Sequence, residues 1–354
     1  MKMAHPHELK NRLNKDQAME KIAQETFERK TISFYRYVKI ADPVALRNDL
    51  FVAWEKFSCL GRIYIAKEGI NAQMNVPEPV WEDFVTHLYS LDEFKGVPFK
   101  HAVEDPEESF WKLTMKVKDK IVADGLNDET FDASDVGEHL DAEAFNAKLE
   151  DSDTICVDMR NFYESEVGHF EGAITPDCAT FREELPMVKE ALEGKEDKEL
   201  LLYCTGGIRC EKASSYLRHH GFKKVYQLHG GIIDYAHQVK AKGLESKFKG
   251  KNYVFDGRPS ERITDDVLSC CHQCGESCDD HVNCANMACN LLFIQCVNCA
   301  AKTNQTCSAE CEQVSLMSED EQRAYRAGKL KEDPMALGKN PFRRPKADAN
   351  LLKK

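Results

Sequence analysis

The sequence predicts a mixed α/β protein of several domains, and three observations lead to this fold class. Strand-like and helix-like apolar patterns alternate over the N-terminal third of the chain. The middle third holds a dense apolar strand, a glycine-containing loop and an amphipathic helix in direct succession, which is typical of a parallel sheet. Ten of the fifteen cysteines lie between Cys270 and Cys311. A chain of 354 residues is also too long for one small core, so two or three domains are expected.

The N-terminal third predicts a βαββαβ unit. A strand begins at Thr31, and a helix follows Pro43, a residue that favours the first helical turn. Two further strands meet in a hairpin at Lys67–Gly69, and a second helix follows a pair of prolines. A closing strand is expected near Phe99–Val103 or Phe110–Val117. This order indicates a ferredoxin-like sandwich, a fold that many regulatory, RNA-binding and acylphosphatase-like domains share, so it predicts no function.

The stretch LLLYCTGGIRCEKASSYL, Leu200–Leu217, predicts a reactive cysteine. Cys204 follows a buried strand, and Gly206 and Gly207 allow a tight turn whose N–H groups point inward. A helix then starts, so its positive end and the charge of Arg209 lie near the sulfur. Such surroundings favour the thiolate, and they suit a persulfide or a phosphate equally well.

Three motifs in this region resemble the rhodanese-type sulfurtransferases. Their six-residue active-site loop corresponds here to Cys204, Thr205, Gly206, Gly207, Ile208 and Arg209. The upstream segment VDMRNFYESEVGHFEGAI and the downstream segment VYQLHGGIIDYA resemble the flanking signatures of the same domain. The resemblance implies a rhodanese-like α/β domain with a parallel sheet, in which Cys204 is catalytic and the other loop residues form an anion cradle.

Three more residues are expected to support this loop. The rhodanese pattern implies that Asp158 and Arg160 brace the wall of the site by ion pairing. Cys210 lies six residues after Cys204, where it could resolve an oxidised or persulfidated sulfur, although a structural role is favoured. His169 is expected to be structural, and the sequence offers no Cys–His dyad.

The cysteine cluster predicts metal binding. Two C-x-x-C pairs, Cys271/Cys274 and Cys296/Cys299, are separated by 21 residues, which is close to zinc-ribbon spacing. The remaining candidates supply a second four-coordinate ion with one cysteine to spare: Cys278, Cys284, Cys289, Cys307 and Cys311. We expect a cross-braced module with two structural zinc ions, and an iron–sulfur cluster is the alternative.

Charge and hydropathy exclude some classes of protein. No segment has the roughly 18 uninterrupted apolar residues of a membrane span, and the polar N-terminus predicts no secretory signal, so we expect a cytoplasmic protein that does not contact membranes. The net charge of −12 argues against unspecific coating of nucleic acid. Residues 127–194 hold 4 basic and 19 acidic residues, whereas residues 195–251 hold 12 and 6, so the Cys204 half is locally basic.

Motifs and composition together predict the domain boundaries. We expect residues 1–30 as an N-terminal extension, 31–125 as the ferredoxin-like domain, 126–150 as an acidic linker helix, 151–242 as the rhodanese-like catalytic domain, 243–265 as a connector, 266–315 as the zinc module and 316–354 as a flexible tail.

From about Thr31 to Cys311 the arrangement is similar to that of the bacterial tRNA uridine hydroxylases. This resemblance implies oxygen-dependent 5-hydroxylation of the wobble uridine, with the anticodon region of tRNA as the partner and molecular oxygen as co-substrate. We expect Lys212 and Arg218, in the locally basic segment, to contact the RNA. The alternative is a sulfurtransferase that carries a persulfide on Cys204 to a small-molecule or RNA acceptor. A third possibility, a binding module without catalysis, is disfavoured by the presence of Cys204. The sequence does not predict the oligomeric state.

Overall fold

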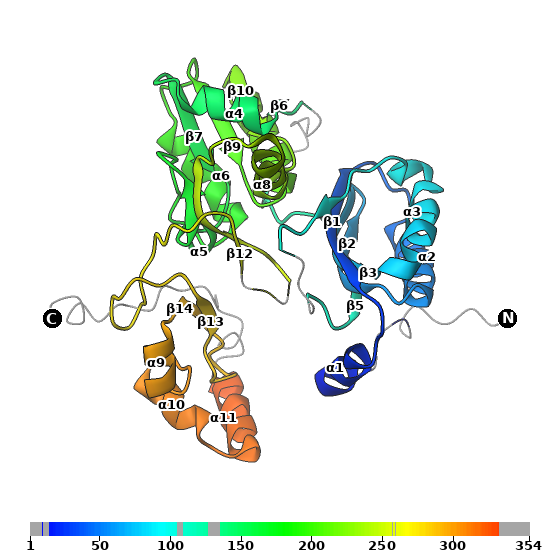
Figure 1. The fold of residues 1–354 in the computed structure, drawn as a ribbon, viewed down its shortest axis with the longest axis vertical. Helices are drawn as coiled ribbons and strands as arrows, with labels where there is room; N and C mark the ends of the chain where they lie inside the picture. Colours follow the sequence, from blue (N-terminus) through cyan, green and yellow to red (C-terminus); the bar gives the residue numbers. More distant parts are fainter. Residues whose placement is uncertain are drawn as a thin grey trace.

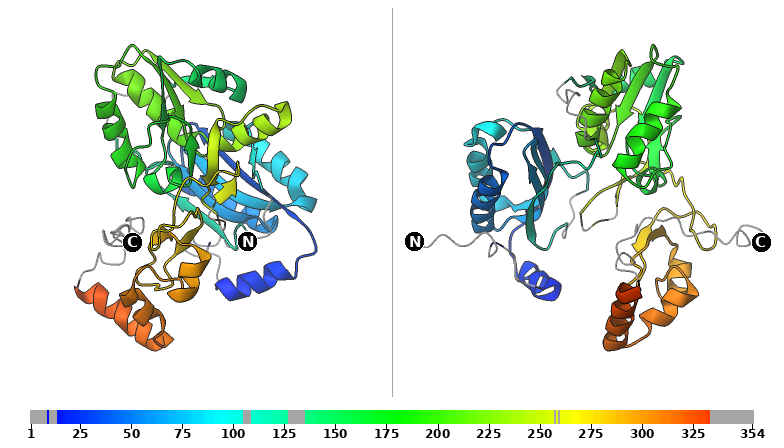
Figure 2. Two further views of the ribbon diagram at one scale, coloured as in Figure 1. Left: turned by 60° about the vertical axis from the view of Figure 1, so that its left-hand side comes forward. Right: turned by 180° about the vertical axis from the view of Figure 1, so that it is seen from behind.

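The computed structural model contains three folded units (Figure 1). It describes residues 9, 14–104, 109–126, 135–256, 258 and 260–332. The N-terminal unit and the middle unit lie next to each other, and the cysteine-rich unit lies at one end of the molecule (Figures 1 and 2). No helix in the described part of the chain is long and apolar enough to cross a membrane.

The N-terminal unit has the ferredoxin-like fold that the sequence predicts. Its strands are β1 (Arg29–Tyr37), β2 (Leu60–Ala66), β3 (Gly69–Pro77), β4 (Lys100–His101) and β5 (Leu113–Val117). They form one sheet in the order β4-β1-β3-β2-β5. Both segments considered for the closing strand are used, because β4 pairs with β1 while β5 adds a parallel edge strand beside β2.

One face of this sheet is covered by helices. These are α2 (Pro43–Lys56) and α3 (Trp81–Tyr89), and α1 (Lys15–Ala23) and the short helices η1 (Glu78–Val80) and η2 (Asp92–Phe94) complete the unit. Helix α2 begins where predicted, because the Asp42 side chain accepts hydrogen bonds from the N–H groups of Val44 and Ala45. Trp54 and Phe84 are fully buried against the sheet. The opposite sheet face remains available to another domain.

The middle unit is the predicted α/β domain with a parallel sheet. Strands β6 (Glu138–Leu140), β7 (Thr154–Asp158), β9 (Glu199–Tyr203) and β10 (Lys224–Leu228) pair in parallel in the order β6-β10-β9-β7. The helices are α4 (Ala142–Leu149), α5 (Phe162–Ser165), α6 (Phe181–Ala191), α7 (Ile208–His219) and α8 (Gly231–Lys242). Successive residues of β9 point alternately into two cores. One core lies beneath α6 and α7, and the other lies beneath α4 and α8.

The segment expected to be an acidic linker contributes to this domain. Strand β6 forms an edge of the parallel sheet, and Phe145 of α4 is fully buried in the same core as Leu201 of β9. Residues 127–134 of that segment lie outside the described residues.

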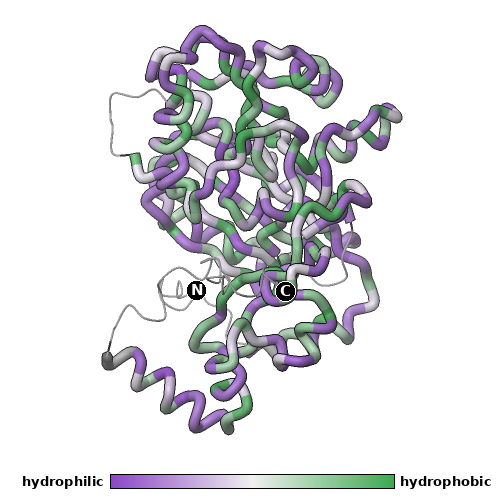
Figure 3. Tube along the Cα trace, turned by 90° about the vertical axis from the view of Figure 1, so that its left-hand side faces the viewer, coloured by the Kyte–Doolittle hydropathy of each residue, from purple (hydrophilic) through white to green (hydrophobic). Residues whose placement is uncertain are grey.

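The remaining elements connect the domain to the cysteine-rich unit. Strands β8 (Gly168–Phe170), β11 (Phe248–Tyr253) and β12 (Ser260–Arg262) form a small sheet, and β13 (His281–Asn283) pairs with β14 (Leu292–Ile294). Helices α9 (Val297–Lys302), α10 (Ala309–Ser315) and α11 (Glu319–Glu332) follow. Helix α11 occupies part of the segment predicted as a flexible tail and is coloured mostly hydrophilic (Figure 3). Residues 333–354 of that segment lie outside the described residues.

A buried ion pair fixes the end of the parallel sheet. Arg160 donates two hydrogen bonds to the Asp158 carboxylate, at 2.8 and 2.7 Å, and both side chains are fully buried. Arg160 also donates to the Gly168 carbonyl, while the Tyr203 hydroxyl donates to Asp158 at 2.8 Å. The pair thus ties β7, β8 and β9 together.

Removing one member of this ion pair should destabilise the domain. In Asp158→Ala the Arg160 charge stays buried without compensation, so the free energy of unfolding should fall by about 3–5 kcal/mol. Urea denaturation of the full chain measures the change. Asp153→Ala, which breaks an exposed pair with Lys198 in the same domain, is the control and should change stability far less. Equal effects of the two substitutions would contradict the bracing role.

Candidate active site

The Cys204 loop connects β9 to α7 as the sequence predicts. Gly207 caps α7 with φ +94°, a conformation that favours glycine, and its N–H group lies 3.1 Å from the Cys204 sulfur. The loop is held from behind by the start of α8, where Ile232 N–H donates to the Cys204 carbonyl at 3.0 Å. A side chain at Gly231 would collide with this loop, since its Cβ would lie 2.5 Å from the same carbonyl oxygen. Gly230 and Gly231, the glycine pair of the downstream segment, therefore allow α8 to pack directly against the Cys204 loop.

The surroundings of Cys204 stabilise a thiolate. Burial raises the pKa of the thiol, but a hydrogen bond from Cys210, the charge of Arg209 and the backbone N–H groups of both residues lower it to about 6. The Cys210 thiol itself stays protonated, because burial and the neighbouring thiolate raise its pKa. Cys204 is therefore ionised at neutral pH, which is the form that acts as a nucleophile.

Arg209 is fixed by a partner that the sequence analysis did not name. Its guanidinium donates to both carboxylate oxygens of Glu164, at 2.6 and 2.8 Å, and Glu164 is fully buried. Arg209 and Glu164 also contact the Thr205 hydroxyl, both at 3.3 Å. Burial lowers the pKa of Arg209, but the Glu164 carboxylate raises it well above the ordinary value, so the charge is permanent. Glu164 lies four residues after Arg160 in the upstream segment that resembles a rhodanese signature, so it was within a motif that the sequence showed.

The supporting residue Cys210 acts on the Cys204 thiolate through its thiol. Its hydrogen bond is among the causes that lower the pKa of Cys204, and both cysteines are free. Cys210 therefore stabilises the thiolate directly, which is a role that the sequence analysis did not consider. His169 has the structural surroundings that were expected, with its Nδ1 2.8 Å from the Ser165 carbonyl.

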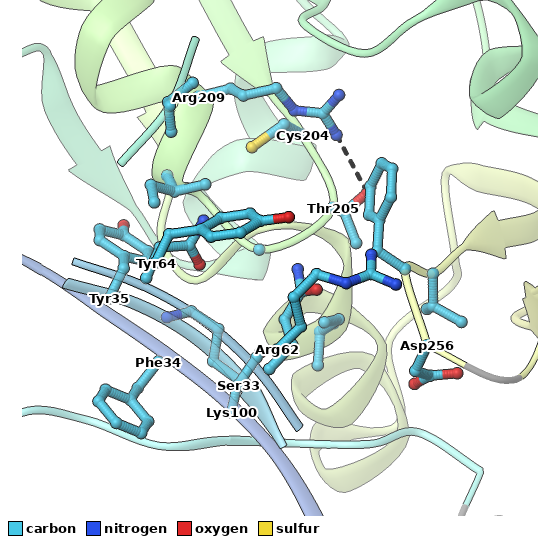
Figure 4. Close-up of a pocket in the computed structure, with 18 of the residues that line it drawn as sticks. Ser33, Phe34, Tyr35, Arg62, Tyr64, Lys100, Cys204, Thr205, Arg209 and Asp256 are labelled. Atoms are coloured by element: carbon cyan, nitrogen blue, oxygen red, sulfur yellow. Dashed lines mark hydrogen bonds between the residues drawn. The ribbon is translucent and has the colours of Figure 1, made fainter. Parts of the chain in front are cut away.

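Cys204 borders a cavity of about 420 Å³ between the two domains. Cys204, Thr205, Gly206, Ile208 and Arg209 line one side, and the helix-free face of the N-terminal sheet lines the other. Figure 4 shows Ser33, Tyr35, Arg62, Tyr64 and Lys100 on the side opposite Cys204 and Arg209. The connector completes the cavity with Val254, Phe255, Asp256, Arg258 and Glu261. The candidate site is thus built by two domains, whereas the motifs identified only one of them.

Strand register arranges the sheet face of the cavity in two rows. Ser33 of β1 pairs with Gln73 of β3, which pairs with Arg62 of β2. In the next row Asn71 lies between Tyr35 and Tyr64. Neighbouring residues of the same strands, such as Phe34 and Ile63, point into the core instead.

Helix α7 joins the two domains. The Tyr35 hydroxyl donates to Glu211 at 2.9 Å, and Lys212 forms an ion pair with Glu68 at 2.7 Å. Lys212 is buried in this contact, so our expectation of a surface cation that contacts RNA is wrong for this residue. Arg218, the other expected RNA contact, is partly exposed and forms an ion pair with Asp135 at 2.9 Å.

The structure brings eight of the nine candidate metal ligands into two groups. One group consists of Cys271, Cys274, Cys296 and Cys299, and the other of Cys284, Cys289, Cys307 and Cys311. The sulfur atoms within each group lie within 4.8 Å of one another, so each group could hold a metal ion. The first and third cysteine pairs of the sequence form one group and the second and fourth the other, which is an interleaved arrangement. Cys278 belongs to neither group and packs against Val167 and Ile294.

The Cys210 hydrogen bond can be tested by titration. Cys210→Ala removes a donor to the Cys204 thiolate, so the thiolate should appear at a pH higher by about one unit, because a hydrogen bond to a charged group contributes about 1.5–3 kcal/mol. The absorbance of the thiolate is measured against pH, and the absorbance of a matched Cys204→Ser protein is subtracted. The difference gives the midpoint of Cys204 ionisation. Cys59→Ala, in the core of the N-terminal domain, should leave the midpoint near pH 6. An unchanged midpoint in Cys210→Ala would contradict the assignment.

Comparison with known proteins agrees with this organisation. The UPF0176 acylphosphatase like domain matches residues 29–121, the Rhodanese-like domain matches 141–238 and the Rhodanase C-terminal family matches 249–312. These matches cover the ferredoxin-like sheet, the Cys204 domain and the cysteine-rich unit in turn.

Several relatives are similar over almost their whole length. The chain is 54% identical to the tRNA uridine(34) hydroxylase of Leptospira interrogans, over 92% of this chain and 89% of that protein. It is 51% identical to the protein of the same name in Pectobacterium atrosepticum, over 91% of each chain. The corresponding protein of Photorhabdus laumondii is 52% identical over 91% of this chain and 92% of its own length. By this similarity the chain belongs to the tRNA uridine(34) hydroxylase family.

Proposed function

We propose that this protein is a tRNA-modifying enzyme that hydroxylates uridine 34, the wobble position of the anticodon, at carbon 5. The observation that carries the proposal is the position of Cys204, whose sulfur lies 3.1 Å from the Gly207 N–H group at the edge of a cavity between two domains. The volume of about 420 Å³ is within the range of small-ligand sites and suits a single nucleoside. A base that reaches such a cavity must leave the anticodon stack, which single-stranded loops permit. A tRNA substrate makes the cytoplasm the expected location.

The names of the relatives match this function rather than the sulfurtransferase alternative. The cavity also has a second wall, formed by a polar sheet face that carries tyrosine, glutamine, serine and lysine side chains. Delivery of sulfur to a small acceptor needs only the loop that binds the persulfide. The second wall instead fits the recognition of a larger substrate with several hydrogen-bonding groups.

Cys204 is the proposed catalytic residue. The Gly207 N–H group and the Cys210 thiol contact its sulfur, and the fixed charge of Arg209 favours any anionic form of it. The same contacts suit a persulfide and an oxidised thiol, the two states considered for the reaction with molecular oxygen as co-substrate. Asp158 and Arg160 maintain the sheet from which the loop emerges and have no proposed contact with substrate.

The role of Cys204 is tested by substitution. Cys204→Ser should lower the formation of 5-hydroxyuridine in tRNA by about a hundredfold or more, because loss of a nucleophile removes its reaction path. Mass analysis of tRNA nucleosides, from a deletion strain that expresses each variant, measures the product. Cys270→Ser changes an exposed cysteine outside both metal groups and should leave the product unchanged. Full activity of Cys204→Ser would exclude the proposed role.

We further propose that each cysteine group holds one structural zinc ion. A tetrahedral zinc site with zinc–sulfur bonds of about 2.3 Å has sulfur–sulfur edges of about 3.8 Å. The sulfurs of Cys274 and Cys296 lie 3.6 Å apart, and Cys307 lies 3.7 Å from both Cys289 and Cys311. Such short separations fit four thiolates around one ion better than thiolates spread around an iron–sulfur cluster. Bound zinc would supply the cross-links of a unit with few apolar residues.

Zinc content tests this assignment. The purified protein should contain about two zinc ions per chain, and Cys271→Ser should reduce this by about one ion. The matched control is Cys278→Ser, in the same unit but outside both groups, which should retain both ions. Elemental analysis together with thiol titration gives the stoichiometry. Equal zinc loss in the two variants, or iron in place of zinc, would contradict the assignment.

A further inference from the structure

Lys100 in the cavity wall has no ion-pairing or hydrogen-bonding partner among the described residues that balances its charge. Its side chain is 5% exposed, and its ammonium group makes no hydrogen bond or ion pair with any residue that the structure describes. Burial lowers the pKa of Lys100, and attraction by Asp234, Cys204 and Glu211 offsets this only in part. A charged group is costly to bury without a partner, so its presence in a cavity indicates a function rather than a contribution to stability.

The fold places Lys100 directly beside the Cys204 loop. Lys100 pairs with Ser33 across β4 and β1, so the two side chains share the cavity face of the sheet. Its Cδ atom lies 3.8 Å from the position that a Cβ on Gly206 would occupy. The ammonium group lies over the ring of Tyr35, 4.5 Å from its centroid, and Tyr35 is itself fixed by Glu211. Lys100 is therefore held at the site where a substrate would meet the catalytic sulfur.

The neighbouring side chains also offer groups that can bind a ligand. Among the described residues, Gln73 and the Tyr64 hydroxyl make no side-chain hydrogen bond. The Tyr64 ring stacks on no other described ring, and it contacts Lys118, whose Nζ lies 5.7 Å from the ring centroid. Tyr64 lies between the sheet and the Cys204 loop in Figure 4. A half-buried aromatic ring that lines a cavity beside polar groups is an arrangement that proteins use to hold an unstacked base.

We propose that this cavity binds the target uracil, with Tyr64 against the face of the base and Lys100 donating a hydrogen bond to its O4 oxygen. The inference rests on the proposed function and extends it, because it makes the N-terminal domain the part that selects the base. An ammonium group donates hydrogen bonds and accepts none. Uracil presents an acceptor at position 4, whereas cytosine presents an amino group there. Lys100 would therefore favour uracil and oppose cytosine.

Binding in the absence of turnover tests the proposal. The protein is a full-length Cys204→Ser variant, and the probes are two anticodon stem-loop RNAs that differ only in uridine or cytidine at position 34. This protein should bind the uridine RNA about tenfold more tightly, because one good contact to a base edge discriminates to this degree against the wrong base. Adding Lys100→Gln should bring the ratio close to one, since an amide can accept as well as donate.

Two matched variants isolate the effect. Lys100→Arg keeps a cation that only donates and should retain the preference for uridine. Lys56→Gln removes the same charge from α2, which covers the opposite face of the sheet, and should leave both affinities unchanged. Thermal unfolding confirms that each variant is folded. Lys100→Gln should be about as stable as the parent, because removal of a buried charge without an ion-pairing partner offsets the loss of the cation–π contact with Tyr35.

A change in the RNA gives a second test that does not depend on the folding of a variant. A stem-loop with a pyrimidin-2-one nucleoside at position 34 lacks O4, so it should bind the Lys100 protein about tenfold more weakly than the uridine RNA. The proposal is overturned if Lys100→Gln retains the preference for uridine, if the Lys100 protein shows no preference, or if loss of O4 has no effect. These assays need no product, so a failure of hydroxylation would count against the proposed function alone.

Discussion

A buried thiolate requires nearby positive charge and hydrogen-bond donors, and the arrangement of the catalytic domain follows from this requirement. Arg209 supplies the charge, and Glu164 holds the guanidinium in place from α5. The Cys210 thiol and the Gly207 N–H group supply donors at the start of α7. The Asp158–Arg160 pair keeps the ends of the strands in register beneath the loop. Because these groups are buried and bonded to one another, the loop is preorganised and needs no rearrangement to favour the ionised sulfur.

The loop alone does not make the site, since half of the cavity wall belongs to the N-terminal sheet. A ferredoxin-like sheet with helices on one face leaves a polar face uncovered, and here that face meets the Cys204 loop across the cavity. Helix α7 couples the two domains, because its first turn surrounds Cys204 while Glu211 and Lys212 bond to Tyr35 and Glu68. The proposed catalysis and the proposed base selection thereby lie in different domains, which contact each other through α7.

Local patterns predicted most of the fold and the centre of the site. The βαββαβ order and the strand, loop and helix around Cys204 were all readable, because each depends on neighbouring residues. The sequence did not show which side chains bond to partners that lie far away along the chain. Glu164 was visible as part of a motif, but its bonds to Arg209 depend on how α5 packs against the loop. Lys100 lies in a strand that was expected, but nothing in the local sequence links its side chain to the Cys204 loop. Lys212 looked like a surface cation because its partner Glu68 is 144 positions away. Which cysteines share a metal site also depends on the interleaved fold of the cysteine-rich unit, and the spacing alone does not show it.

The central claim is that the target base reacts between the two domains, and photochemical cross-linking tests it most directly. An anticodon stem-loop with 4-thiouridine at position 34 would be irradiated in complex with the Cys204→Ser protein, and the cross-linked peptides identified by mass spectrometry. The account predicts cross-links to β1 or β2, at residues such as Tyr35 or Tyr64, which line the cavity opposite the sulfur. Cross-links confined to the cysteine-rich unit, or to the outer surface of the rhodanese-like domain, would contradict it.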